Sequence, residues 1–215
     1  MSNSGAIPIK IIMVGSINVG KTSLVTKYAT GKNHTKKGST KNASYVSKMK
    51  KVNGITFEIK LWDTAGQEKF KSLTKLFIKD AKIAILVYSI DDEQSFNDLD
   101  DWLNLIKSAN DGANIIYGIV ANKSDLESDK TLSDEIGKEY AKNLGATWRK
   151  TSAITGELKF EDYINELFLK YHNSNFDVNT SNPESITLSI ENSKAEKKGC
   201  CGGGNSNENQ SANKQ

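Results

Sequence analysis

Ile7–Thr22 reads IPIKIIMVGSINVGKT, an apolar run that leads directly into a glycine-rich loop. The run from Ile7 to Val14 predicts a buried strand, and Gly15–Thr22 matches the pattern G-x-x-x-x-G-K-[ST]. Glycines let backbone N–H groups surround phosphate oxygens, and the N-terminus of a following helix favours negative charge. The alternative is a chance glycine turn, but the strand before the loop favours phosphate binding. On its own, the loop predicts a nucleoside triphosphate and no particular base.

The positions of this loop have different predicted tasks. The Lys21 ammonium reaches the β- and γ-phosphates, and the Thr22 hydroxyl is a ligand for Mg²⁺. The residues predicted to surround the bound phosphates are Gly15, Ser16, Ile17, Asn18, Val19, Gly20, Lys21, Thr22 and Ser23.

The remaining sequence alternates strand and helix patterns. Two further apolar runs predict buried strands, and two strand patterns flank the strong turn signal Asn53-Gly54. These four segments are Ile83–Tyr88, Ile115–Ala121, Tyr45–Lys51 and Ile55–Trp62. Helical periodicity is found over Glu93–Lys107, Leu132–Leu144 and Leu158–Tyr171. The pattern predicts an α/β fold, a doubly wound and mostly parallel sheet with one antiparallel edge hairpin.

Length and composition limit the class of protein. The 215 residues, 37% of them hydrophobic, suffice for one domain with a buried core and a tail. The net charge of +3 is too small to predict nucleic-acid binding, and we expect a monomer. No apolar run is long enough for a membrane span, and residues 1–8 lack a signal peptide. We predict a flexible N-terminus over residues 1–6, a folded domain over 7–172 and a disordered polar tail over 173–215.

The two cysteines, Cys200 and Cys201, are adjacent and lie in the predicted tail. The domain therefore cannot form an internal disulfide, which fits the reducing cytoplasm. Met1-Ser2 excludes N-myristoylation, because that modification requires glycine after the initiating methionine.

A second motif, Asn122-Lys123-Ser124-Asp125, predicts the base. It directly follows a predicted buried strand. The Asp125 carboxylate can accept hydrogen bonds from the N1–H and exocyclic amine of guanine, whereas adenine has no such donor pair. Thr151-Ser152-Ala153 follows the next strand and can offer a backbone N–H to the guanine O6. The motif alone could be a polar loop, but together with the phosphate loop it predicts guanine.

A third motif, Trp62–Glu68, reads WDTAGQE and predicts the chemistry at the γ-phosphate. Asp63 ends a strand and can hold magnesium through a water molecule. The Gly66 N–H can contact the γ-phosphate, and Gln67 can orient the attacking water, which makes it the predicted catalytic residue.

In order and spacing, GSINVGKT, WDTAGQE, NKSD and TSA resemble the Ras superfamily of small GTPases. WDTAGQEKF, Phe70–Thr74, Leu86–Ile90 and Asp92–Phe96 are most similar to its Rab branch. The resemblance covers roughly residues 7–172 and implies the G-domain fold, with Thr40 as a second Mg²⁺ ligand and Ile154 beside the guanine. It also implies slow GTP hydrolysis, an exchange factor, an activating protein and effectors. The implied place of work is the cytosolic face of an intracellular vesicle membrane.

The segment around Thr40 departs from the family pattern. The run that follows is Lys41–Tyr45, and Asn33 and Lys37 fall where the family usually has aromatic residues. Seven lysines and no acidic residue lie between Gly31 and Lys51. Two interpretations stay open here: a diverged, solvated loop, or a basic face for acidic partners or anionic lipid headgroups.

Three other departures concern the phosphate loop, the base and the tail. Ile17 is bulky where the family has a small residue and could crowd Gln67, while Ile154 replaces a lysine that lies along the guanine. Cys200-Cys201 resembles the Rab lipidation signal, but fourteen residues follow it. The cysteines are therefore either lipidated, with trimming or by palmitoylation, or unmodified thiols.

Three functions follow from these patterns. A working GTP/GDP switch is the main prediction. A guanine-nucleotide-binding scaffold that hydrolyses GTP poorly is supported only by Ile17 and the divergent Thr40 segment. An ATP-dependent small-molecule kinase is disfavoured by Asn122–Asp125.

Overall fold

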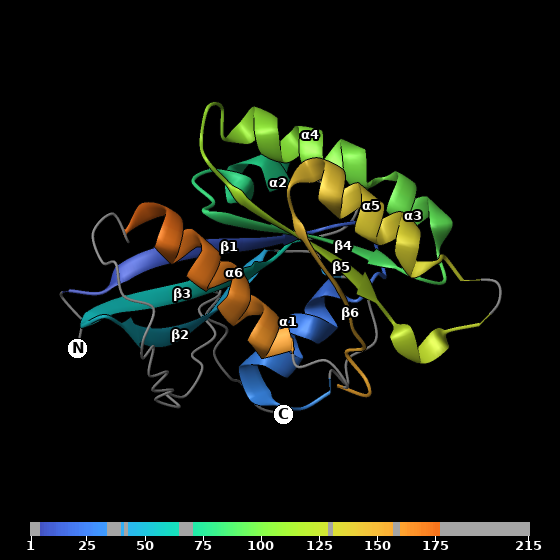
Figure 1. Cartoon of the computed structure of the whole chain (residues 1–215), viewed down its shortest axis with the longest axis horizontal. Coiled ribbons are helices and arrows are strands. Elements are labelled where there is room, and N and C mark those ends of the chain that lie inside the picture. The colour runs from blue at the N-terminus through green and yellow to red at the C-terminus, as the bar shows by residue number, and fades with distance from the viewer. Residues whose placement is uncertain are drawn as a thin grey trace, which may run out of the picture.

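The computed structural model describes residues 5–33, 40, 43–64, 71–128, 131–156 and 160–176, with only the backbone of residues 71–74. It is built around a six-stranded sheet in the order β2-β3-β1-β4-β5-β6 (Figure 1). The strands are β1 Ile7–Val14, β2 Ser44–Val52, β3 Ile55–Asp63, β4 Ile83–Ser89, β5 Ile116–Asn122 and β6 Thr147–Lys150. β2 runs antiparallel to β3, and the other neighbouring strands are parallel. The predicted fold class is confirmed.

Helices cover both faces of this sheet. α1 and α6 pack on one face, and α2, α3, α4 and α5 lie on the other (Figure 1). Their bounds are α1 Lys21–Thr30, α2 Lys71–Ile78, α3 Glu93–Asn97, α4 Leu99–Ala109, α5 Asp134–Leu144 and α6 Phe160–Asn175, with a 3-10 turn, η2, at Ser124–Leu126. Each face has its own apolar core. Within the described ranges, no helix is both long and apolar enough to cross a bilayer.

The hairpin between β2 and β3 forms at the predicted turn. Asn53 has φ 50° and Gly54 has φ 80°, the left-handed conformations that a tight two-residue hairpin turn requires. Val52 and Ile55 pair directly beside the turn, and the register continues to Ser44 and Asp63. The turn thus fixes the register that pairs Asp63, the last residue of β3, with Ser44 of β2.

The single helix predicted over Glu93–Lys107 is wrong in one respect, because the structure divides it into α3 and α4 at Asp98. Asp92 caps the N-terminus of α3, and its side chain accepts a hydrogen bond from Ser95 N–H. The Asp98 carboxylate is turned towards the phosphate loop, where Ser16 Oγ donates to its Oδ2 at 2.6 Å. Sequence periodicity cannot reveal such a long-range contact.

The last helix runs farther than its apolar pattern predicts, to Asn175 instead of Tyr171. The reason is an aromatic cluster at its end: the Phe176 ring stacks on His172 and contacts Phe57 of β3, both at 5.5 Å between ring centroids. From residue 177 onward the predicted tail, including Cys200 and Cys201, lies outside the described residues.

Candidate nucleotide-binding site

The predicted motifs meet at the carboxyl end of the parallel strands. The phosphate loop follows β1, Asp63 ends β3, Asn122 ends β5, and Thr151 follows β6. In open α/β sheets this edge is where ligands bind, because the connecting loops converge there. The sheet therefore gathers segments that lie far apart in the sequence.

Two glycines allow the phosphate loop to fit closely against its neighbours. Gly15 has φ 141°, and a Cβ at this position would lie 2.1 Å from the Val87 carbonyl oxygen of β4. Gly20 has φ 95°, and a Cβ there would lie 2.3 Å from Asn122 Nδ2. Neither position can accommodate a side chain without movement of the loop or its neighbour. The loop is a cradle of backbone groups, as phosphate binding requires.

Lys21 lies across this loop and is 5% exposed. Its ammonium donates hydrogen bonds to the carbonyl oxygens of Gly15 at 2.7 Å and Ser16 at 2.8 Å. Burial lowers the pKa of Lys21 to about 8, and the attraction of Asp63 partly opposes this shift. Phosphate oxygens in the cradle would stabilise the protonated lysine, because opposite charges attract strongly in a buried site.

Three oxygen-bearing side chains fit a magnesium ion. Thr22 Oγ1 at the start of α1 and Thr40 Oγ1 are 2.5 Å apart, so the two hydroxyls predicted as Mg²⁺ ligands are in contact. Asp63 is 2% exposed at the end of β3, and Thr64 Oγ1 secures this end by donating to the Met13 carbonyl at 2.6 Å. Hydroxyl and carboxylate oxygens are the hard ligands that Mg²⁺ prefers.

The Asn122 side chain connects the base motif to the phosphate loop. It is 1% exposed, and its Nδ2 donates to the Val19 carbonyl at 2.6 Å. Among the described residues, its buried Oδ1 accepts no hydrogen bond. This residue, predicted among the nucleotide-binding side chains, therefore also positions the phosphate loop.

The two loops that are predicted to bind guanine are held against each other. Ser152 Oγ donates to Asp125 Oδ1 and accepts from the backbone N–H groups of Ile154 at 3.0 Å and Thr155 at 3.1 Å. The Ser124 N–H donates to the Thr151 carbonyl at 3.1 Å, which joins the two loops through the backbone as well. The Asp125 carboxylate is thus tied to the loop that carries Ser152.

Lys123 and Lys150 form ion pairs next to the same loops. Lys123 has φ 65°, and its ammonium contacts Asp91 Oδ1 at 3.3 Å. Lys150 of β6 forms ion pairs with Glu127 at 2.5 Å and Asp134 at 3.0 Å, and these partners raise its pKa although burial opposes them. These ion pairs connect the two loops to Asp91 and to the N-terminal turn of α5.

Known proteins share this arrangement of motifs. The model of the Ras family matches residues 10–173. The chain belongs to the Ras family. The Ras-related protein Rab-21 of Geodia cydonium is 38% identical over 160 residues, 74% of this chain and 67% of the relative. Human Rab-21 is also 38% identical over 160 residues, 74% of this chain and 68% of its own. Rab-11B of Dictyostelium discoideum is 36% identical over 185 residues, which cover 85% and 80% of the two chains.

These similarities identify a Rab-like small GTPase, an enzyme that hydrolyses GTP. Two of the predicted γ-phosphate residues of this Rab-like GTPase, Gly66 and the catalytic candidate Gln67, lie outside the described residues, as does Lys37. Ile17 is 40% exposed and Ile154 is 63% exposed, so neither fills the core. Asn33 accepts a hydrogen bond from Lys27 Nζ at 2.7 Å, where the family usually has an aromatic ring.

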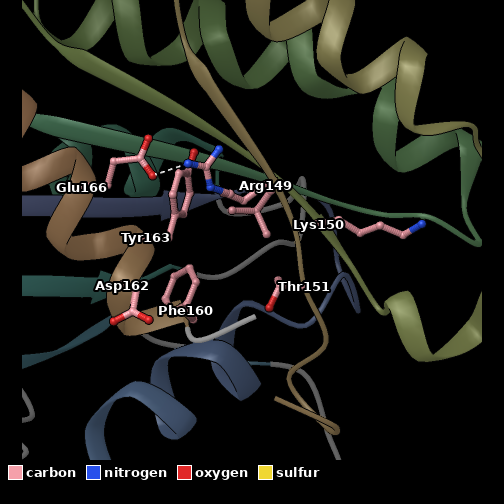
Figure 2. A pocket seen from close by; sticks show the side chains of 8 residues that line it. Arg149, Lys150, Thr151, Phe160, Asp162, Tyr163 and Glu166 are labelled. Atoms are coloured by element: carbon pink, nitrogen blue, oxygen red, sulfur yellow. Dashed lines mark hydrogen bonds and ion pairs between the residues drawn. The ribbon is translucent and has the colours of Figure 1, made fainter. Parts of the chain in front are cut away.

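Two cavities of the Rab-like GTPase lie beside the loop that begins at Thr151. A cleft of about 300 Å³ lies between α1 and Thr151–Gly156, and a pocket of about 200 Å³ lies between β6 and α6. Figure 2 shows Arg149 of this pocket reaching towards Glu166, with which it forms an ion pair at 2.6 Å, while Lys150 points away. Thr151, Phe160 and Asp162 line both cavities. Neither cavity is lined by the phosphate loop.

Sequence reasoning missed two residues that support the site. Asp98 holds Ser16, and Thr64 secures the strand end that carries Asp63. Thr64 lies inside the WDTAGQE motif, and this position was a usable signal. Asp98 occupies an ordinary helical pattern, so no local signal pointed to it.

Proposed function

We propose that this Rab-like GTPase is a GTP/GDP switch in membrane trafficking that binds its nucleotide and Mg²⁺ at the carboxyl end of the sheet. The contact of 2.5 Å between the Thr22 and Thr40 hydroxyls carries the proposal. It joins the phosphate loop to a segment remote in sequence, at the place where both threonines would hold the metal with Asp63. Bound Mg²⁺ would neutralise phosphate charge.

The side chains divide the work between affinity, specificity and hydrolysis. Lys21 places a positive charge against the β- and γ-phosphates, and Asp125 selects guanine. Gln67 orients a water molecule that attacks the γ-phosphorus, and the bond to the β–γ bridging oxygen breaks to give GDP and phosphate. The Thr40 segment and the Gly66 segment would hold the γ-phosphate and be released when it leaves.

Regulators and membrane attachment complete the proposal. An exchange factor would load GTP, an activating protein would accelerate hydrolysis, and effectors would bind the GTP state. Lipidation of Cys200 or Cys201 would place a monomeric protein on the cytosolic face of an intracellular membrane. The family relationship and the paired cysteines support this part.

The exposed Ile17 favours a second candidate, a nucleotide-loaded scaffold with poor hydrolysis. Its side chain is 40% exposed in the phosphate loop. There it would be close to a bound γ-phosphate and could obstruct Gln67. Single-turnover GTP hydrolysis by wild type and Gln67→Leu separates the two. The switch requires a slower rate in the variant, whereas equal rates would favour the scaffold.

The test of the proposal is nucleotide selection. GTP and GDP should displace a bound fluorescent GDP with far higher affinity than ATP. Asp125→Asn should move the preference towards xanthine nucleotides, because an amide can donate to the xanthine 2-carbonyl. Asp111→Asn makes the same chemical change on an exposed loop and should keep the guanine preference. Competition by ATP as effective as that by GTP would refute guanine recognition.

A further inference from the structure

Ser16, the second residue of the phosphate loop, is held from two sides. Its backbone carbonyl accepts a hydrogen bond from Lys21 Nζ at 2.8 Å. Its side-chain hydroxyl donates to Asp98 Oδ2 at 2.6 Å. Ser16 therefore stands between the buried lysine of the nucleotide site and a carboxylate that lies 82 positions away in the sequence.

Asp98 is itself well fixed at the junction of α3 and α4. Its second carboxylate oxygen, Oδ1, accepts from Gln94 Nε2 at 2.7 Å. Its backbone N–H donates to the Gln94 carbonyl at 2.9 Å, and its carbonyl accepts from Trp102 N–H at 3.2 Å. The carboxylate is only partly exposed, and its hydrogen bond to Ser16 is partly buried. Such charge-assisted bonds are roughly twice as strong as neutral ones.

Two hydrogen bonds from side chains outside the phosphate loop, here called tethers, hold its two halves. Asn122 holds the second half through the Val19 carbonyl, and Asp98 holds the first half through Ser16. The Asn122 tether comes from the end of β5, within the predicted guanine motif. The Asp98 tether comes from the junction of α3 and α4, on the face of the sheet opposite α1. The loop must keep its backbone N–H groups convergent to hold phosphate, so movement of either end weakens the cradle.

We propose that Asp98 is a positioning residue for nucleotide binding: through Ser16 it holds the first half of the phosphate loop in its phosphate-binding form and slows nucleotide release. This inference rests on the proposed function, since it requires guanine nucleotide in the loop. Asp98 does not touch the phosphates. It acts on them through Ser16 and the carbonyl that Ser16 offers to Lys21.

The test is the rate at which GDP carrying a fluorescent methylanthraniloyl group leaves the full-length, Mg²⁺-loaded protein into excess unlabelled GDP. Asp98→Ala and Ser16→Ala should each accelerate release about tenfold, which corresponds to about 1.4 kcal/mol. The double variant should release no faster than the faster single variant, because both changes remove the same bond. Asp98→Asn, whose amide oxygen still accepts from Ser16, should restore part of the slow release.

Two controls separate positioning from general stability. Asp100→Asn removes the same charge two residues away, where the carboxylate contacts Tyr140 instead of the loop, and should leave release unchanged. Asp92→Ala removes the side-chain cap of α3 and should lower the unfolding temperature without changing release.

The outcomes are distinct. Three results would each overturn this inference and leave the proposed function intact. They are wild-type release rates in Asp98→Ala and Ser16→Ala, additive effects in the double variant, and faster release from Asp92→Ala. If Asp98→Ala does not fold, Asp98→Asn and Ser16→Ala still decide the matter. A wild-type protein that does not bind the labelled GDP at all would overturn the proposed function, and the inference with it.

Discussion

Single atoms limit what the phosphate loop can tolerate. The virtual Cβ of Gly20 lies 2.3 Å from Asn122 Nδ2, which is itself committed to the Val19 carbonyl. Gly31, at the end of α1, has a similar left-handed backbone, with φ 70°, but its added Cβ would meet no non-neighbouring atom of the described residues within 4 Å. The two glycines therefore separate the cost of backbone strain from the cost of a steric collision.

Gly20→Ala should weaken GDP binding by at least about tenfold, because relief of the collision costs about 1–3 kcal/mol and displaces the loop. Gly31→Ala carries only the left-handed strain, about 1–2 kcal/mol, and should destabilise the fold without a comparable loss of affinity. Titration of GDP and thermal unfolding of both variants measure the two effects. Equal GDP affinity in the two variants would show that the collision is relieved without loop movement.

The sequence predicted the residues of the site better than their orientations. Gly15, Lys21, Thr22 and Asp125 all lie at the carboxyl end of the sheet, because each motif follows a strand and the ends of parallel strands converge. Asn122 was assigned to the nucleotide, yet its amide nitrogen donates to the phosphate loop. Such a contact depends on how two strands are packed, which no local pattern encodes.

At the scale of elements, two lysines of the edge strand β2 join it to α6. Lys48 forms an ion pair with Glu161 at 2.8 Å and lies 4.1 Å from the Tyr28 ring centroid. Lys50 donates to Asn165 at 2.8 Å and lies 4.9 Å from the Phe168 ring centroid. These two members of the lysine-rich Gly31–Lys51 segment are therefore parts of the packing between β2 and α6.

Lys50 should make this packing depend on pH. Burial lowers its pKa from 10.5 to about 8, although Glu161 opposes the shift. Below pH 8 the folded protein must carry the partly buried charge, and from pH 8 to about 10.5 it loses the proton before the unfolded chain does, so stability rises. The unfolding temperature of wild type minus that of Lys50→Met should therefore increase from pH 7 to pH 10.

Lys51→Met, on the exposed side of the same strand, is the matched control. Its difference from wild type should stay constant across this pH range. A constant difference for Lys50→Met as well would mean that the Lys50 ammonium is solvated in the folded protein.

Elements that depend on local sequence were predicted, whereas features that depend on long-range contacts were not. The β2–β3 hairpin was predicted because Asn53-Gly54 can adopt the required left-handed turn with no outside help. The break between α3 and α4 was missed, because the apolar periodicity continues across Asp98, which lies between the two helices. α2 was also missed: its segment, Lys71–Ile78, is amphipathic but only eight residues long, too short for periodicity alone to distinguish a helix.

At the scale of the whole molecule, the C-terminal end of α2 is anchored to β1 and to the end of α4. Asn110 Nδ2 at the end of α4 donates to the Ile78 carbonyl at 3.2 Å, and Lys10 Nζ of β1 donates to the Lys79 carbonyl at 2.7 Å. Ile78 is fully buried. A conformational change that starts at Gly66 should therefore fade before it reaches Ile78.

Hydrogen exchange of the GDP-loaded protein and of protein loaded with a non-hydrolysable GTP analogue should differ over residues 31–44 and 65–79. The difference should be smallest at the anchored end, and β4 and β5 should be unchanged because each is paired with a neighbouring strand on both sides. Equal protection of residues 31–44 in the two states would remove the switch and favour the scaffold.

The close approach of Gly20 and Asn122 also constrains how this protein can evolve. A lineage cannot gain a side chain at position 20 while the asparagine amide occupies that space. Residue 122 would have to shorten first, which would release the Val19 carbonyl before any benefit arose. Substitutions at the two positions, about a hundred residues apart in the chain, therefore depend on each other. The order in which they occur decides whether the intermediate protein still holds its nucleotide.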